Sequence, residues 1–168
     1  MGVFYASAGG NTTQIAEALQ EKFGIDDEDM IFMEDDYDDI EQFEEYDILF
    51  IGSSTWGQGD PHFEWVDPIL ELEDEQPDLS GKKVAFFGAG DCDKHGEHFC
   101  SALGKLYKVF TKLGATPIGA VDASGYEFEY SLAQIESKLC GLAIDNVNEE
   151  DKTPQRIENW LKQLESEV

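Results

Sequence analysis

Residues 2–24 have the sequence GVFYASAGGNTTQIAEALQEKFG, an apolar run followed by a loop of small residues and a helical pattern. The run Gly2–Ala6 is short and unbroken, as in strands that are buried on both faces. Apolar residues then recur at helical spacing up to a glycine stop at Gly24, namely Ile15, Leu19 and Phe23. The stretch predicts a strand–loop–helix unit, the building block of an α/β fold.

The same unit recurs along the chain. Further apolar runs typical of buried strands lie at 31–33, 48–53, 84–88 and 117–121. Helical patterns separate or follow them, at Val66, Ile69 and Leu70, over Phe99–Leu113, and from Thr153 with Pro154 in the first turn. This alternation predicts a doubly wound α/β fold, a parallel sheet with helices on both faces.

The length of 168 residues suits one domain, residues 1–168. An insertion of about twenty residues, at 122–143, interrupts the pattern around the fifth strand. Within it Tyr126, Phe128 and Tyr130 alternate with other residues, which predicts a small extra strand pair.

Charge is the most unusual property of the composition. The chain has 37 acidic and 11 basic residues, a net charge of -26, which repels nucleic acid and anionic membrane surfaces. Residues 1–81 hold 23 of the acidic residues and a single basic one, Lys22. We expect one strongly negative face and basic partners, although an acidic surface also serves solubility alone. No apolar stretch is long enough to span a membrane and the mean hydropathy is -0.40, so we expect a cytoplasmic protein.

Three loops that follow strands form the candidate site, because ligands of doubly wound sheets bind beyond the carboxyl ends of the strands. Ser7-Ala8-Gly9-Gly10-Asn11-Thr12 offers small residues, hydroxyls and a helix N-terminus to a phosphate, without any basic residue. Ser54-Thr55-Trp56-Gly57-Gln58-Gly59 presents a tryptophan on which a planar ring could stack, and Gly88-Ala89-Gly90-Asp91 is a second glycine-rich loop. Taken alone, the first loop also fits an ordinary turn with Asn11 as N-cap, and Trp56 also fits an anchor to the fold. Together the loops predict a flat, phosphorylated ligand.

The three cysteines, Cys92, Cys100 and Cys140, are an odd number without a CxxC pair, which argues against a disulfide framework. Cys92, His95, His98 and Cys100 lie within nine residues and are residue types that bind zinc. Their spacing matches none of the usual zinc patterns, and Cys100 falls on the apolar stripe of a helix. We therefore predict no metal site.

The order and spacing of the three loops resemble the flavodoxin family, small electron carriers built around FMN. Ser7–Thr12 is similar to the family's phosphate loop, usually [ST]-x-T-G-x-T, while Thr55-Trp56-Gly57 and Gly88-Ala89-Gly90-Asp91 are similar to its second and third loops. The segment Gly141–Asp145 and the closing helix with Trp160 also resemble the family, and the insertion resembles its long-chain branch. The resemblance covers nearly the whole chain and implies a five-stranded parallel sheet in the order 2-1-3-4-5.

This resemblance implies a low-potential carrier of single electrons on non-covalently bound FMN, with no catalytic residues and no substrate of its own. A strongly negative chain agrees with a low potential, because it disfavours an anionic reduced flavin. The implied partners of the monomer are redox proteins with basic docking patches, such as a ferredoxin/flavodoxin–NADP reductase, meeting it near Trp56 and Asp60-Pro61-His62. The peptide after Gly57 is the implied redox switch, since glycine adopts positive φ at little cost.

Two positions depart from the family's pattern. Gly9 stands where a threonine is usual, and the missing hydroxyl should weaken phosphate binding by about 1–2 kcal/mol. His95 stands where a tyrosine usually stacks on the flavin, and we expect it to stack there and to place a cation against the reduced ring when protonated. His98, one helical turn further, is expected at the surface.

Other functions share parts of the pattern. A response-regulator receiver needs an acidic pair after strand one and an aspartate after strand three, where this chain has Ser7-Ala8-Gly9 and Ser53-Ser54. An FMN-dependent quinone reductase or a ribonucleotide-reductase activator shares both fold and cofactor, and turnover of NAD(P)H without a partner would identify the reductase. A regulator that kept the fold but lost the cofactor would show no flavin absorbance.

Overall fold

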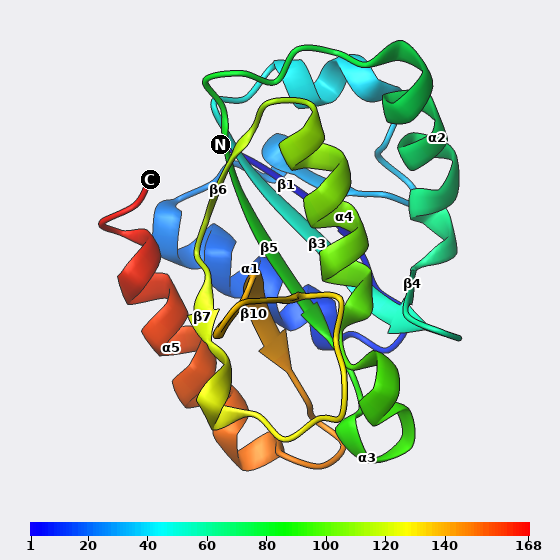
Figure 1. Cartoon of the computed structure of the whole chain (residues 1–168). Coiled ribbons are helices and arrows are strands. Elements are labelled where there is room, and N and C mark those ends of the chain that lie inside the picture. The colour runs from blue at the N-terminus through cyan, green and yellow to red at the C-terminus, as the bar shows by residue number, and fades with distance from the viewer.

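Strand β1 (Gly2–Ala6) lies between two parallel neighbours, β2 (Met30–Phe32) and β3 (Ile48–Trp56), in the computed structural model, which describes residues 1–168 (Figure 1). Beyond β3 the sheet continues with β5 (Lys83–Ala89) and β10 (Gly141–Ile144), both parallel to it. The strand path β10-β5-β3-β1-β2 confirms the doubly wound sheet of order 2-1-3-4-5. Short β4 (Asp60–Pro61) pairs antiparallel with the end of β3.

The unbroken apolar runs arise because the sheet is covered on both faces. Successive side chains of a strand point to opposite faces, so a residue and its neighbour enter different cores. Phe4, Ile51 and Phe86 are fully buried in one core, and Val3, Phe50 and Phe87 are fully buried in the other.

Helices α1 (Asn11–Phe23) and α5 (Thr153–Leu164) cover one face of the sheet, and α2 (Val66–Glu75) and α4 (Ser101–Lys112) cover the other (Figure 1). A short helix, α3 (Cys92–His95), follows β5. Six one-turn helices complete the chain, at Asp27–Asp29, Ile40–Glu44, Phe63–Trp65, Gly96–His98, Ala123–Gly125 and Glu150–Lys152. None of the helices combines the length and the apolar character that crossing a membrane requires.

Helix α2 exposes apolar residues that its spacing predicts to be buried. Val66 and Leu70 are 53% and 58% exposed, whereas Leu72 on the same helix is fully buried. Trp65, directly before the helix, is fully buried and donates its indole N–H to the carbonyl of Gly52 at 3.0 Å. This anchor fixes the rotation of the helix and turns Val66 and Leu70 to the outside.

The fifth strand is split into two parts. β6 (Thr116–Ile118) pairs with the first half of β5, and β10 pairs with the second half. The intervening segment, 119–140, is therefore displaced by about three residues from the expected 122–143. Gly141–Ala143 belong to the sheet rather than to the insertion.

The insertion forms its own three-stranded sheet from β7 (Val121–Asp122), β8 (Gln134–Ile135) and β9 (Lys138–Leu139). The prediction of strands at Tyr126–Tyr130 is wrong, because two of these aromatic rings pack inward instead. Tyr126 and Phe128 lie against Phe99 with ring centroids 6.1 and 5.5 Å apart. Arg156 of α5 stacks on Tyr126 at 4.0 Å and so fastens the insertion to this helix.

Close strand packing makes Gly88 a test of the fold. An added Cβ would lie 2.1 Å from the carbonyl oxygen of Ser53 on the neighbouring strand. We predict that Gly88→Ala lowers the free energy of unfolding by about 3 kcal/mol, measured by urea denaturation, because neither backbone can move aside. The control Gly125→Ala has nothing within 4 Å of the new Cβ and should change stability by less than about 0.5 kcal/mol. Equal effects of the two variants would contradict the tight pairing.

Candidate functional site

A cavity of about 290 Å³ lies where β1, β3 and β5 end, between the three predicted loops. The predicted residues that line it are Ala8, Gly9, Asn11, Ser54, Thr55, Trp56, Gly57, Ala89, Gly90, Asp91 and His95. Lys94, His98, Phe99 and Cys100 complete its wall. The predicted residues Ser7, Gly10, Thr12, Gln58, Gly59 and Gly88 belong to the same loops but do not line the cavity.

The first loop is a tight turn into α1. Ser7 Oγ accepts a hydrogen bond from the Gly10 N–H at 3.2 Å, and Gly10 has the positive φ of 79° that favours glycine. Gly10, not Asn11, occupies the N-cap position of the helix. Asn11 instead accepts a hydrogen bond from the side-chain amide of Asn146 at 3.0 Å, which ties the loop to the segment after β10. The first loop is thus held from its own turn and from across the sheet.

The second loop presents Trp56 to solvent. Its side chain is 51% exposed, and its indole N–H donates to Ser54 Oγ at 2.8 Å. The Gly59 N–H donates to the Trp56 carbonyl at 3.0 Å and closes the turn, with exposed Gln58 at its tip. His62 is only 3% exposed and lies edge-on to Trp56, so within the expected contact loop Asp60-Pro61-His62 its side chain packs inward. Burial lowers the pKa of His62 from its usual 6.5.

The third loop leads into α3 and the one-turn helix after it, which carry His95 and His98 of the cavity wall respectively. Asp91 caps α3 by accepting from the Lys94 N–H at 3.0 Å. His95 is exposed and lines the cavity, as predicted. His98, predicted to lie at the surface, is half-buried and also lines the cavity, because the one-turn helix after α3 turns it back toward the second loop.

Asp145, directly after β10, holds the third loop in place, a role that no sequence motif indicated. Its carboxylate is fully buried and accepts hydrogen bonds from the N–H groups of Cys92, Val147 and Asn148, at 2.8, 3.0 and 3.0 Å. The Asn148 side-chain amide bridges Asp145 and Asp91, at 2.9 and 3.0 Å. Burial alone would raise the pKa of Asp145, but the hydrogen bonds from Asn148 and Cys92 outweigh it and hold the pKa below 3.8.

Two hydroxyls at the site lack partners within the protein. Thr12 Oγ1 and Thr55 Oγ1 are both buried and make no hydrogen bond. Buried polar groups are normally paired, and an unpaired one costs about 1–3 kcal/mol. The two hydroxyls come from the first and second loops, so they suit a ligand rich in acceptor oxygens, as a phosphate or a flavin is.

No three His, Cys, Asp or Glu side chains are grouped as a metal site would require. All three cysteines are free thiols, and Cys100 is fully buried in the core. Burial raises the pKa of Cys92 to about 12, so its thiol stays protonated at neutral pH.

The chain is a doubly wound α/β protein with a cavity at the carboxyl ends of its strands. The three loops around this cavity include one suited to a phosphate, so the protein is of the nucleotide-binding α/β class. The sequence profile of the flavodoxin family matches residues 3–160. Flavodoxin 1 of Azotobacter vinelandii is 46% identical over 99% of this chain and 96% of that protein. Flavodoxin 1 of Escherichia coli strain K12 is 37% identical over 99% and 93% of the two chains. A solved structure of Fusobacterium nucleatum flavodoxin bound to flavin mononucleotide has a TM-score of 0.84 and 26% identity, covering 99% and 97% of the chains.

The chain belongs to the flavodoxin family. Flavodoxins are electron-transfer proteins and not enzymes, and they work with redox partner proteins. The predicted family and class of function are therefore confirmed.

The network around Asp145 predicts a pH-dependent stabilisation. Asp145→Asn places a donor against N–H groups and should lower the free energy of unfolding by about 2 kcal/mol at pH 7, measured by urea denaturation. Because the folded pKa lies below the unfolded value of 3.8, the ionised carboxylate stabilises fully above about pH 4. That contribution is lost as the pH falls through the lower folded pKa.

The difference between the protein and Asp145→Asn should accordingly shrink in acid. Asp122→Asn is the matched control, since Asp122 also accepts a backbone hydrogen bond, from Ser124 at 2.7 Å, but is exposed. It should change stability by less than about 1 kcal/mol. A pH-independent effect of Asp145→Asn would show that the ionised carboxylate is not the stabilising group.

Proposed function

We propose that this protein carries single electrons at low potential on a non-covalently bound FMN, with residues 1–168 acting as one FMN-binding domain. The observation that carries the proposal is the pair of buried, unpaired hydroxyls of Thr12 and Thr55 at the edge where the three loops meet. Bound FMN supplies the reversible one-electron chemistry, while the protein binds and orients it.

Each loop has a part in holding the cofactor. Ser7–Thr12 would bind the phosphate through backbone N–H groups and hydroxyls at the start of α1. Ser54–Gly59 and Gly88–Asp91 would border the ring, with Trp56 and His95 as its aromatic neighbours. Because no basic side chain belongs to the first loop, the phosphate keeps its charge and adds to the bias against an anionic reduced flavin.

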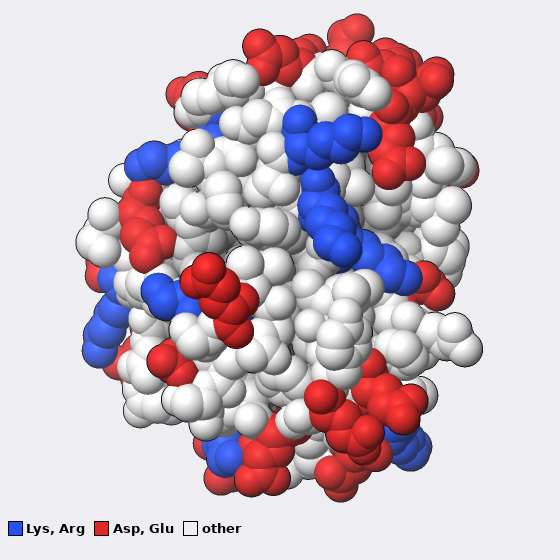
Figure 2. Space-filling model, viewed as in Figure 1, with Lys and Arg blue, Asp and Glu red and all other residues white.

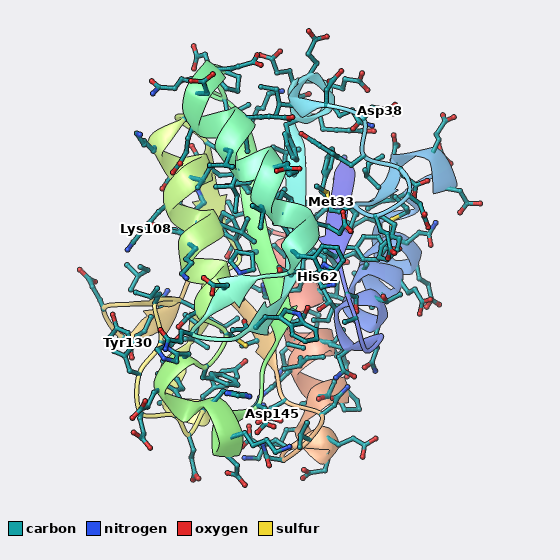
Figure 3. All side chains as sticks on the ribbon, turned by 90° about the vertical axis from the view of Figure 1, so that its right-hand side faces the viewer. Met33, Asp38, His62, Lys108, Tyr130 and Asp145 are labelled. Atoms are coloured by element: carbon teal, nitrogen blue, oxygen red, sulfur yellow. The ribbon has the colours of Figure 1, made fainter.

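On the face shown in Figure 2, most acidic side chains gather toward the two ends of the molecule. Asp38 lies at the end opposite Asp145, which marks the carboxyl edge of the sheet (Figure 3). Screening reduces interactions beyond a Debye length of about 8 Å, so the acidic residues at the far end act weakly on the cofactor. The local bias comes instead from the phosphate and from Asp91 in the cavity wall, and Lys94 in the same wall opposes it.

The excess of acidic residues also bears on the partners of the protein. We infer that the monomer works in the cytoplasm and meets redox proteins that carry basic patches, such as a ferredoxin/flavodoxin–NADP reductase. Exposed Trp56 marks the edge of the cavity through which electrons would leave. Opposite charges on the two proteins would accelerate docking and make its rate depend on salt.

Purification of the recombinant protein tests the proposal directly. A flavin absorbance spectrum with one FMN per chain, and no oxidation of NAD(P)H without a partner enzyme, is the expected result. Turnover of NAD(P)H by the protein alone would favour a reductase, and a colourless protein that binds no added FMN would refute the proposal.

Removal of the unpaired Thr12 hydroxyl should weaken FMN binding. Thr12→Val should weaken FMN binding about tenfold, measured by quenching of flavin fluorescence, since one hydrogen bond to a charged group is lost. Thr116→Val is the control, because Thr116 is exposed on β6, which pairs with the amino-terminal half of β5, away from the cavity. Gly9→Thr should act in the opposite sense, because its new Cβ meets nothing within 4 Å and the family's usual hydroxyl returns. Unchanged affinity in Thr12→Val would remove this hydroxyl from the phosphate site.

Substitution of Gly57 should change the one-electron potentials of the bound flavin. Its φ of 51° is strained for a β-branched residue by about 1–3 kcal/mol, so Gly57→Val should restrict the peptide before Gln58. We expect the two one-electron potentials to move closer together by several tens of millivolts, because the one-electron state loses stability and about 60 mV corresponds to 1.4 kcal/mol. Gly125→Val, in open space, is the control in the dithionite titration. Identical potentials in the protein and Gly57→Val would contradict a switch at this peptide.

A further inference from the structure

A row of lysines runs along α4 in this acidic protein. Lys105, Lys108 and Lys112 follow one another at helical spacing, and Figure 2 shows basic side chains along the length of this helix. Lys108 projects from the helix, away from the body of the molecule (Figure 3). The row contains three of the 11 basic residues of the chain, so positive charge is concentrated on one face.

Most of this positive charge has no partner within the protein. Lys105 bonds to Asp60, but neither Lys108 nor Lys112 has a carboxylate within 4.0 Å. Like charges four residues apart destabilise a helix, and a chain with 37 acidic residues has ample means to pair them. The unpaired lysines therefore suit an anionic group from outside the chain.

The row borders a groove of about 330 Å³ between α2 and α4. Three lysines of the row line it together with Pro61, Ile69 and Val109, against a single carboxylate, that of Glu73. Apolar side chains continue outward along the neighbouring helix. Phe63, Val66 and Leu70 are 67%, 53% and 58% exposed and follow one another at helical spacing. A surface that combines exposed apolar side chains with unpaired lysines fits an amphipathic protein segment better than a bare phosphate.

The groove also adjoins the cofactor site. Asp60, which holds Lys105, pairs with Trp56 where β4 meets the end of β3. A protein docked along α4 would therefore reach the exposed tryptophan at one end of the row.

We propose that the groove between α2 and α4 docks an acidic, amphipathic segment of a redox partner protein. Carboxylates of the segment meet Lys108 and Lys112, and its apolar side chains meet Ile69 and Val109. That the partner is a redox protein rests on the proposed electron-transfer function, whereas the docking surface itself does not depend on it. The protein would thus offer one surface to basic partners and a second one to an acidic partner.

A titration of the FMN-loaded, 15N-labelled protein with a synthetic peptide tests the surface. The peptide carries leucine and glutamate at helical spacing and is about 15 residues long, enough to form a helix on binding. Amide signals of α2 and α4 should shift, and Lys108→Glu/Lys112→Glu should weaken binding about tenfold. The control Lys138→Glu/Lys162→Glu changes the net charge equally, at exposed lysines outside the groove, and should weaken binding less than about twofold.

Three outcomes would overturn the proposal. Equal weakening in both double variants would show an effect of net charge alone. Tripolyphosphate binding as tightly as the peptide would assign the lysines to a phosphate ligand. Self-association of the protein that Lys108→Glu/Lys112→Glu abolishes, measured by sedimentation equilibrium without peptide, would assign the groove to a second copy. Flavin absorbance in the same samples reports cofactor binding separately, so failure of the docking surface is distinguishable from failure of the proposed function.

Discussion

Helices cover both faces of the parallel sheet, and this double burial determines where the polar and functional groups of the protein can lie. A strand covered on both sides has no room for polar chemistry along its length, so the functional groups gather in the loops beyond the strand ends. Because β1, β3 and β5 are parallel, the three loops that follow them meet at the carboxyl ends of the strands, around a single cavity, although they are far apart in the sequence. Gly88 shows how closely the strands approach, because a Cβ there would meet the backbone of Ser53.

The edge loops are held from the far side of the sheet rather than by their own contacts alone. Asp145 and Asn146 follow β10, and they bond to the third and first loops respectively. A buried carboxylate is a demanding anchor, since it must be fully hydrogen-bonded to stay charged. The split of the fifth strand by the insertion leaves this anchor intact, because β10 pairs with β5 on the cavity side of the insertion.

The charge pattern separates two roles. Carboxylates beside the cavity act on the cofactor, whereas those at the opposite end affect solubility and the approach of partners. The lysine row on α4 is positive in a negatively charged protein, and it borders a groove that α2 lines with Ile69. Local charge, and not the net charge of -26, therefore decides what each face can bind.

The strand and helix pattern and the three loops could be predicted from the amino-acid sequence, because periodic burial and loop chemistry are local properties of the chain. The resemblance of those loops to flavodoxins then gave the family. Loop chemistry also placed Trp56 at the cavity, whereas the resemblance to flavodoxins placed His95 there. Only the tertiary structure decided that His62 is buried, that His98 turns inward, that Tyr126 and Phe128 pack on Phe99, and that Val66 and Leu70 face outward. These outcomes, like the role of Asp145, depend on how distant segments pack against one another. Spacing along the chain reports which residues share a face, but it cannot report which neighbour will cover that face.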